Sequence, residues 1–136
     1  MSDEHPARAV SKKSIAAVKA KSKEDWLALF APDAVIQDPV GKSPIDPSGE
    51  GHKGTDAIGK FWDNQNAPNT IHFEVRESYA AGSECANVGT ITIGMPNGMK
   101  ARCDGVFVYR VNDDGKLVSL RAHWEFDQMM ATIAPA

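Results

Sequence analysis

The carboxylate of Asp38 is the group in this sequence best placed to do chemistry, because the backbone on both sides of it is restrained. Asp38 follows a β-type run at 34–37 and directly precedes Pro39. A residue before proline is disfavoured in the helical region, so we expect Asp38 on an extended, stiff stretch of backbone. A carboxylate presented in this way to a cavity can act as a general base. An Asp beside a Pro also often accepts a backbone N–H in an exposed turn, and this alternative stays open.

Aromatic side chains form a second group with chemical meaning. Phe107 and Tyr109 share one face of a predicted strand by alternation, and Leu120, Ala122 and Trp124 share one face of the next. Taken together, they favour an apolar cavity for a flat hydrophobic ligand over a pocket for a charged metabolite. For each of them taken singly, ordinary core packing is the alternative.

Other residues carry suitable atoms for chemistry without a suitable arrangement. His123, Glu125 and Asp127 are metal-ligand types that share a strand face, but that face is opposite the apolar one. No metal and no other cofactor is therefore expected. Ser14 and Cys103 are nucleophile types, but neither is paired with a histidine and a residue that orients it. Both suit tight packing.

Composition limits the class of protein. The chain has 136 residues, which is enough for one domain over 1–136, with residues 1–5 expected to be frayed. The net charge is −3 and the basic residues are dispersed, so nucleic acid is not expected as a partner. No apolar run is long enough to span a bilayer, so no membrane association is expected either. Two cysteines and no disulfide framework are typical of a cytoplasmic protein.

Helical patterns occupy the first half of the chain. Pro6 suits the first turn of a helix, and helical spacing continues over 6–21. Ser22 is a typical N-cap of a second helix, and Thr55 opens a third. Between them lies a segment at 41–54, rich in Gly, Pro and Ser, that has no periodicity. A loop of this length often forms the rim or lid of a site.

The second half of the chain has the period of two that is typical of strands. Asn97-Gly98 is a strong hairpin signal between two such runs. The first predicted strand begins at about residue 71, and the others span about 86–95, 99–111 and 116–126. Helices followed by antiparallel strands predict an α+β domain in which the helices cover one face of a curved sheet.

Several motifs in this order resemble the ketosteroid isomerases and their wider SnoaL-like (nuclear transport factor 2-like) relatives. The match runs from about residue 10 to 124, and its most specific pieces are 31–41, with Asp-Pro-Val-Gly at its end, 54–62 and 115–122. The resemblance implies a conical fold with three N-terminal helices packed on a curved, mainly antiparallel sheet. It also implies a pocket open at one end and, often, a homodimer.

The resemblance implies a chemistry that this sequence carries only in part. In the isomerases, a well-known case of tuned carboxyl pKa values, an Asp base moves a proton while a Tyr and a protonated Asp hold the enolate oxygen. The base maps without a gap onto Asp38. The tyrosine position falls on Ser14 and the acid position on Phe107, so both donors are absent. Asp104 is near the acid position but on the opposite strand face, and a bulge at Gly105 would be needed to turn it inward.

The resemblance also assigns the walls of the pocket. Burial among apolar walls is expected to raise the pKa of Asp38, because desolvation disfavours the charged carboxylate. With the usual donors missing, water, Tyr109 or Ser14 would have to hold the enolate oxygen. The residues expected around the ligand are Phe30, Val40, Phe61, Trp62, Phe107, Tyr109, Leu120 and Trp124.

Three functions follow from the resemblance. The first is a steroid Δ-isomerase-like enzyme that moves a proton in a hydrophobic ketone with Asp38 as base, its activity weakened by the absent donors. The alternative is a non-catalytic protein that binds a steroid-like or polyketide-like ligand. Relatives of this fold also act as polyketide cyclases or as epoxide hydrolases with a network of carboxylates and arginine. Arg102, Arg110 and Arg121 point away from the cavity by alternation, which disfavours the hydrolase chemistry.

Overall fold

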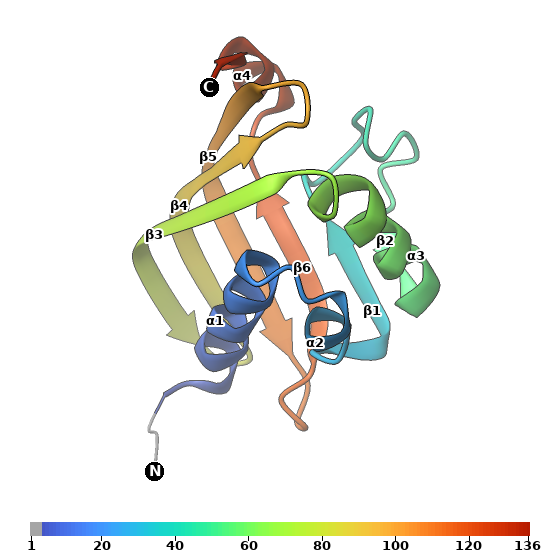
Figure 1. The fold of residues 1–136 in the computed structure, drawn as a ribbon. Coiled ribbons are helices and arrows are strands. Elements are labelled where there is room, and N and C mark those ends of the chain that lie inside the picture. Colours follow the sequence, from blue (N-terminus) through green and yellow to red (C-terminus); the bar gives the residue numbers. More distant parts are fainter. Residues whose placement is uncertain (1–3) are drawn as a thin grey trace.

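The helices of the first half of the chain pack against a single curved sheet in the computed structural model, which describes residues 4–136 (Figure 1). Helix α1 packs across β3, β4 and β5, whereas α3 packs against β1. Ser22 caps α2 by accepting a hydrogen bond from the backbone N–H of Asp25, as its position in the sequence predicts. The helices are α1 (Pro6–Lys19), α2 (Lys23–Leu27), α3 (Gly54–Phe61), a π-helical continuation η1 (Trp62–Asn66) and α4 (Phe126–Ala131).

The sheet is mainly antiparallel and remains open, in the order β2-β1-β6-β5-β4-β3. Its strands are β1 (Phe30–Gln37), β2 (His52–Lys53), β3 (Thr70–Ala81), β4 (Glu84–Gly94), β5 (Met99–Val111) and β6 (Leu117–His123), and β7 (Ala134–Pro135) pairs with β5. The expected α+β class and the conical arrangement of helices on a curved sheet are confirmed. The Asn97-Gly98 hairpin is also present, with Gly98 at a φ of +82°.

One pairing in this sheet is parallel, and it positions the site. Strand β1 runs alongside β6, with Phe30 opposite Leu117 and Gln37 opposite Arg121. Because parallel strands point the same way, the residues that follow their carboxyl ends meet at the same edge of the sheet. Asp38 and Trp124 are therefore brought together from positions 86 residues apart in the chain.

The C-terminal part of the chain differs from the prediction of a strand that continues to Phe126. Strand β6 ends at His123, and the chain then forms α4 and the short strand β7. Thr132 joins this segment to β5 by accepting a hydrogen bond from the Arg102 N–H at 2.8 Å. Helix α4 begins at Phe126 and packs against β5, so the chain leaves the strand conformation before the predicted end of the strand.

The segment 41–54 is built around a buried carboxylate. Asp46 is 8% exposed and accepts hydrogen bonds from the Gly51 N–H and the Ser48 hydroxyl, both at 2.8 Å. The expectation of a loop is met for most of this segment, but its end forms β2, which pairs His52 with Ile36 of β1. The segment is thus tied to the edge of the sheet.

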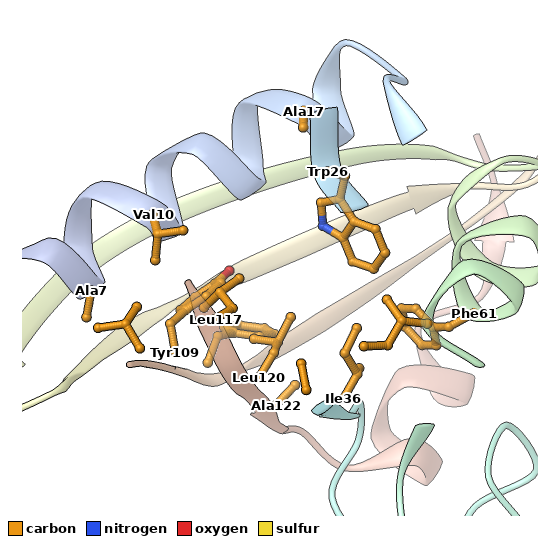
Figure 2. Close-up of a cluster of buried hydrophobic side chains, with 14 of the residues drawn as sticks. Ala7, Val10, Ala17, Trp26, Ile36, Phe61, Tyr109, Leu117, Leu120 and Ala122 are labelled. Atoms are coloured by element: carbon orange, nitrogen blue, oxygen red, sulfur yellow. The ribbon is translucent and has the colours of Figure 1, made fainter. Parts of the chain in front are cut away.

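The hydrophobic core lies between the helices and the concave face of the sheet, and Figure 2 shows Trp26 near its centre. Trp26 is 2% exposed, and its ring lies 4.7 Å from that of Phe30 and 5.1 Å from that of Trp62. Burial of an aromatic side chain of this size stabilises a fold by about 1.5–3 kcal/mol. The core thus fixes α2 and α3 relative to β1.

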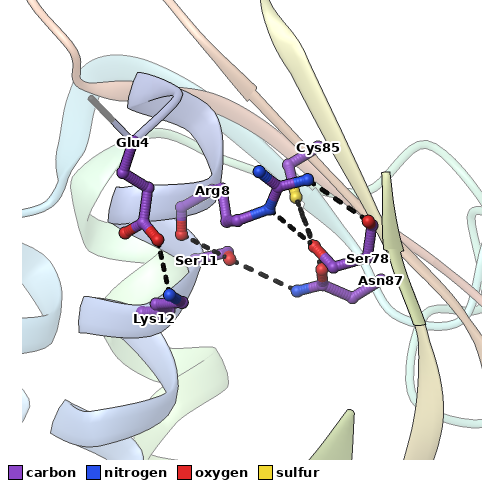
Figure 3. A network of polar contacts seen from close by, with 7 residues as sticks. All are labelled: Glu4, Arg8, Ser11, Lys12, Ser78, Cys85 and Asn87. Atoms are coloured by element: carbon purple, nitrogen blue, oxygen red, sulfur yellow. Dashed lines mark hydrogen bonds and ion pairs between the residues drawn. The ribbon is translucent and has the colours of Figure 1, made fainter. Parts of the chain in front are cut away.

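A network of polar contacts holds α1 on the sheet (Figure 3). Arg8 donates hydrogen bonds to the hydroxyl and the carbonyl of Ser78 on β3, at 3.1 and 3.2 Å. Ser11 accepts a hydrogen bond from the Asn87 side-chain amide on β4 at 3.3 Å. Since buried polar groups are costly without partners, these contacts fix the rotation of α1 and therefore the direction of its inner face.

The beginning of the described chain is held rather than loose. Of the residues expected to be frayed, 1–3 lie outside the described residues. His5 donates from Nε2 to the Gly82 carbonyl at 2.8 Å and accepts from the Ala7 N–H at 3.1 Å, and Glu4 pairs with Lys12. None of the helices within residues 4–136 is long and apolar enough to cross a membrane.

Candidate active site

Two adjoining chambers lie between the helices and the sheet. The α1 chamber has a volume of about 220 Å³ and is lined, among others, by Ser14, Trp26, Asp38, Phe61, Phe107, Tyr109 and Leu120. The α4 chamber has a volume of about 230 Å³ and is lined, among others, by Asp38, Phe61, Met95, Cys103, Trp124, Met129, Met130 and Ile133. Asp38 and Phe61 belong to both linings, so the carboxylate of Asp38 lies where the two chambers meet.

Asp38 is held by one strong hydrogen bond and lines both chambers. The indole Nε1 of Trp124 donates to Oδ1 of Asp38 at 2.5 Å. Burial raises the pKa of Asp38, and the bond from Trp124 and the charge of His52 counteract part of this rise. An indole can only donate, so it orients the carboxylate without competing for a proton. Within residues 4–136, this bond goes to one oxygen only, and the second oxygen, Oδ2, can serve a substrate.

The thiol and the phenol nearest to Asp38 stay neutral. Burial, with the charge of Asp38, raises the pKa of Cys103 to about 12. The same two causes raise the pKa of Tyr109 well above its usual range, and a hydrogen bond with Ser14 counteracts part of the rise. Both groups are therefore protonated at neutral pH, so Tyr109 is available as a hydrogen-bond donor.

Three side chains that line the α1 chamber form a directed chain of hydrogen bonds. Trp26 Nε1 donates to Oγ of Ser14 at 3.2 Å, and Ser14 bonds with the hydroxyl of Tyr109. Since the indole N–H can only donate, the Ser14 hydroxyl accepts from it and can use its own hydrogen to donate a hydrogen bond to the Tyr109 oxygen. The Tyr109 proton then remains free to point into the chamber. Such chains strengthen the last donor, because each bond polarises the next.

The residues predicted for the pocket wall fall into two groups. Phe61, Phe107, Tyr109 and Leu120 line the α1 chamber, and Trp124 lines the α4 chamber. Phe30, Val40 and Trp62 are not among the lining residues of either chamber. Phe30 and Trp62 instead pack on Trp26, and the Val40 N–H bonds to the Ala122 carbonyl. These three residues therefore support the residues around the chambers without lining a chamber themselves.

Asp104 lies outside the site. It is exposed, accepts a hydrogen bond from the Thr90 hydroxyl at 2.6 Å and faces Arg102 at 3.8 Å. The bulge at Gly105 that would have turned it inward is absent, because Gly105 pairs in regular register with Gly89. Phe107, which the resemblance assigns to the acid position, is 1% exposed and packs edge-on against Phe73.

Sequence patterns gave no signal for two parts of the site. His52, whose charge acts on Asp38, lies on a strand of two residues, which is too short to show alternation. The α4 chamber is lined in part by Met129, Met130 and Ile133, from the segment after β6, where the sequence pattern predicts only the end of a strand. Among residues 4–136, no group of three or more His, Cys, Asp or Glu side chains is arranged to hold a metal ion.

The opposite pKa shifts of Asp38 and Asp46 predict opposite effects on stability. A carboxyl with a raised pKa in the folded state destabilises the fold once pH rises through that pKa, so Asp38→Asn is expected to raise the free energy of unfolding at neutral pH. Burial raises the pKa of Asp46, but hydrogen bonds from Ser48 and Gly51 and the charge of His52 outweigh this effect, so the pKa of Asp46 is lowered overall. Asp46→Asn is therefore expected to cost about 1–3 kcal/mol at neutral pH.

Both differences are expected to shrink in acid, where the wild-type carboxyls are protonated as well. Urea unfolding of the three proteins at neutral and acidic pH measures this. Two outcomes contradict the assigned pKa shifts. One is that Asp46→Asn stabilises the protein at neutral pH. The other is that Asp38→Asn destabilises it by the same amount at neutral and acidic pH.

A family model, the SnoaL-like domain, matches residues 12–120 of the chain. The chain therefore belongs to the SnoaL-like domain family. This is the family whose motifs appear in the sequence at 31–41 and 54–62.

Three relatives show what kinds of protein share this fold. The Δ5-3-ketosteroid isomerase from Mycobacterium sp. is 32% identical, with 98% of this chain and 100% of that chain covered and a TM-score of 0.88. RV0760c from Mycobacterium tuberculosis, solved in complex with estradiol-17β-hemisuccinate, is 34% identical over 96% of this chain and 99% of that chain, also with a TM-score of 0.88. The epoxide hydrolase LasB from Streptomyces lasalocidi is 30% identical over 127 residues, which are 88% of this chain and 41% of that protein. The chain thus spans less than half the length of LasB.

Proposed function

We propose that this protein is an isomerase of the ketosteroid isomerase type, which moves a proton within a hydrophobic unsaturated ketone. The observation that carries the proposal is that Asp38 and the chain Trp26–Ser14–Tyr109 face the same apolar chamber. A base and a hydrogen-bond donor in one water-poor cavity are what proton transfer next to a carbonyl requires. The ketosteroid isomerase from Mycobacterium sp. supports this class of activity.

Each group has a defined role in the proposed reaction. The carboxylate of Asp38 takes a proton from the carbon next to the carbonyl, so a C–H bond breaks and an O–H bond forms. The electron pair moves to the ketone oxygen, which becomes an enolate stabilised by the hydroxyl of Tyr109. Asp38 then returns the proton to a carbon further along the conjugated system. The carboxylate is restored and no co-reactant is consumed.

The raised pKa of Asp38 suits this role. A carboxyl whose pKa has moved toward that of the substrate carbon is a stronger base than an exposed aspartate. Trp124 holds one oxygen in place while the other collects and returns the proton. The neutral phenol of Tyr109 can donate throughout, since its pKa lies far above the working range.

The chambers define the substrate as an elongated apolar molecule. Neither chamber alone reaches the size of about 300–1,000 Å³ that is usual for a drug-sized ligand, but together they do. With the ketone at Tyr109, the rest of the molecule would pass Asp38 and enter the α4 chamber. A steroid-like or polyketide-like skeleton has this shape and polarity.

A second candidate is a binding protein without catalysis. It is favoured by Phe107, which fills the acid position of the isomerases with an apolar ring. The steroid ester bound by RV0760c is consistent with it. Epoxide hydrolysis of the kind named for LasB has less support, because Arg102, Arg110 and Arg121 are all exposed and none lines a chamber with Asp38. A cyclase using Asp38 as acid and base would need the same cavity.

The test is the rate at which the wild-type protein converts a β,γ-unsaturated steroid ketone into its conjugated isomer, followed by absorbance. Binding of a non-reactive steroid phenol is measured in parallel by tryptophan fluorescence, since Trp26 and Trp124 line the chambers. We expect turnover above the buffer rate and an affinity of micromolar order. Binding without turnover rejects the isomerase and leaves the second candidate; neither binding nor turnover rejects both.

A further inference from the structure

The π-helical turn η1 and the residues just after it bring side-chain amides to the walls of the chambers. Asn66 lines both chambers, and Gln65 and Asn69 line the α4 chamber. Gln65 and Asn66 are half-buried, and their side-chain amides make no hydrogen bond among the contacts described within residues 4–136. Each amide carries two donor hydrogens and an acceptor oxygen. The wall thus offers hydrogen-bonding groups that the protein itself does not use.

The backbone that carries these amides is held firmly. The Ala67 N–H donates to the Trp62 carbonyl at 2.9 Å, and the Asn69 side-chain amide donates to the Gln65 carbonyl at 2.7 Å. Lys21 donates from Nζ to the Asn69 carbonyl at 2.6 Å. Single π-helical turns are rare, and those that occur are frequently found at functional sites. The uncommitted amides therefore sit on a fixed turn rather than on a loose connection.

The rest of the α4 chamber gives these amides nothing to bind. Most of its lining is apolar and includes Met95 and Met129. The indole N–H of Trp124 already donates to Asp38, and the thiol of Cys103 is only a weak donor. When a wholly apolar molecule fills such a chamber, an amide loses water and gains no partner, which costs free energy. A ligand that brings a polar group to this wall avoids that cost.

We propose that Gln65 and Asn66 are specificity-determining residues, which recognise a second polar group on the part of the ligand that enters the α4 chamber. An amide both donates and accepts, so a hydroxyl or a carbonyl suits it, whereas it supplies no charge to balance an ionised group. The inference rests on the proposed function for the placement of the ketone at Tyr109. It narrows the substrate class to elongated ketones that are polar at both ends and apolar between.

The experiment compares two non-reactive steroid phenols, one with a hydroxyl on the ring farthest from the phenol and one without that hydroxyl. Their dissociation constants are measured by tryptophan fluorescence, and turnover of a β,γ-unsaturated steroid ketone is measured in parallel. The wild-type protein is expected to bind the hydroxylated phenol about 3–10-fold more tightly, which is the usual net effect of one neutral hydrogen bond.

The variants Gln65→Met and Asn66→Leu keep roughly the size of each side chain and remove its polar atoms. Each is expected to reduce the preference for the hydroxylated phenol, and the double variant to abolish it. Affinity for the phenol without the hydroxyl is expected to stay the same or to rise, which also shows that the pocket is intact. The matched control is Asn64→Leu, because Asn64 belongs to the same turn but is exposed and lines neither chamber.

A preference that persists in the double variant overturns the inference, as does the same loss of preference in Asn64→Leu. An equal loss of affinity for both phenols also overturns it, because the amides would then only support the pocket. A preference that the double variant abolishes, in a protein without turnover, supports the recognition and rejects the isomerase. Turnover without any preference rejects the recognition and supports the isomerase, and failure to bind either phenol rejects both.

Discussion

Asp38→Asn is expected to lower the turnover of a β,γ-unsaturated ketone by about 10²–10⁴-fold, the usual contribution of a general base. The amide has nearly the shape of the carboxylate and can still accept the hydrogen bond from Trp124, so the pocket should be preserved. Ligand affinity is therefore expected to be unchanged or higher, because no charge remains to be desolvated when an apolar molecule binds. Steady-state kinetics and a fluorescence titration measure the two effects.

Asp33→Asn is the matched control, since Asp33 lies on β1, the strand that leads into Asp38, and is exposed. It is expected to leave both rate and affinity unchanged. Equal turnover in Asp38→Asn and in wild type would show that the carboxylate is not the base. The proton transfer would then have to be assigned elsewhere, or the activity abandoned.

Tyr109→Phe is expected to lower kcat by about 10²–10³-fold, the loss typical of removing one donor to a developing oxyanion. The negative charge on the ketone oxygen exists only after the proton has left carbon, so KM is expected to change much less than kcat. The volume of the side chain is almost retained, and Tyr109 is 3% exposed, so the fold should tolerate the change. The measurement is the separate determination of kcat and KM.

The chain offers a matched control in Tyr79→Phe, because Tyr79 is 62% exposed on β3 and bonds only to the neighbouring Glu77 among the described contacts. This variant should retain full activity. If Tyr109→Phe also retains full activity, the enolate oxygen is held by another group, and the chain from Trp26 through Ser14 has no part in the reaction.

Local signals were sufficient to predict much of the fold. Pro6 and Ser22 mark helix starts by physical effects that act within one turn, and Asn97-Gly98 marks a hairpin by its backbone preference. Alternation over 99–111 correctly separates buried Phe107 and Tyr109 from exposed Arg110. Asp38 was singled out for the same reason, since the proline that follows it restrains the backbone.

The rest of the site depends on contacts between distant parts of the chain. Nothing near Ser14 indicates that it bonds with Trp26 and Tyr109, because those bonds follow from the way α1 crosses the sheet. His52 lies on a strand of two residues, and α4 has only six, so neither shows a period that can be recognised. Such segments take their structure from the surfaces against which they pack.

The parallel pairing of β1 with β6 also bears on how the protein is made. Strand β1 carries the chain into Asp38, but its partner, Leu117–His123, is translated only after the strands from β2 to β5. Until then β1 lacks a neighbour on that side, and contacts of such long sequence separation form slowly. The nascent chain is therefore expected to expose that edge of β1 until β6 has been translated, and the pocket is expected to close late in folding.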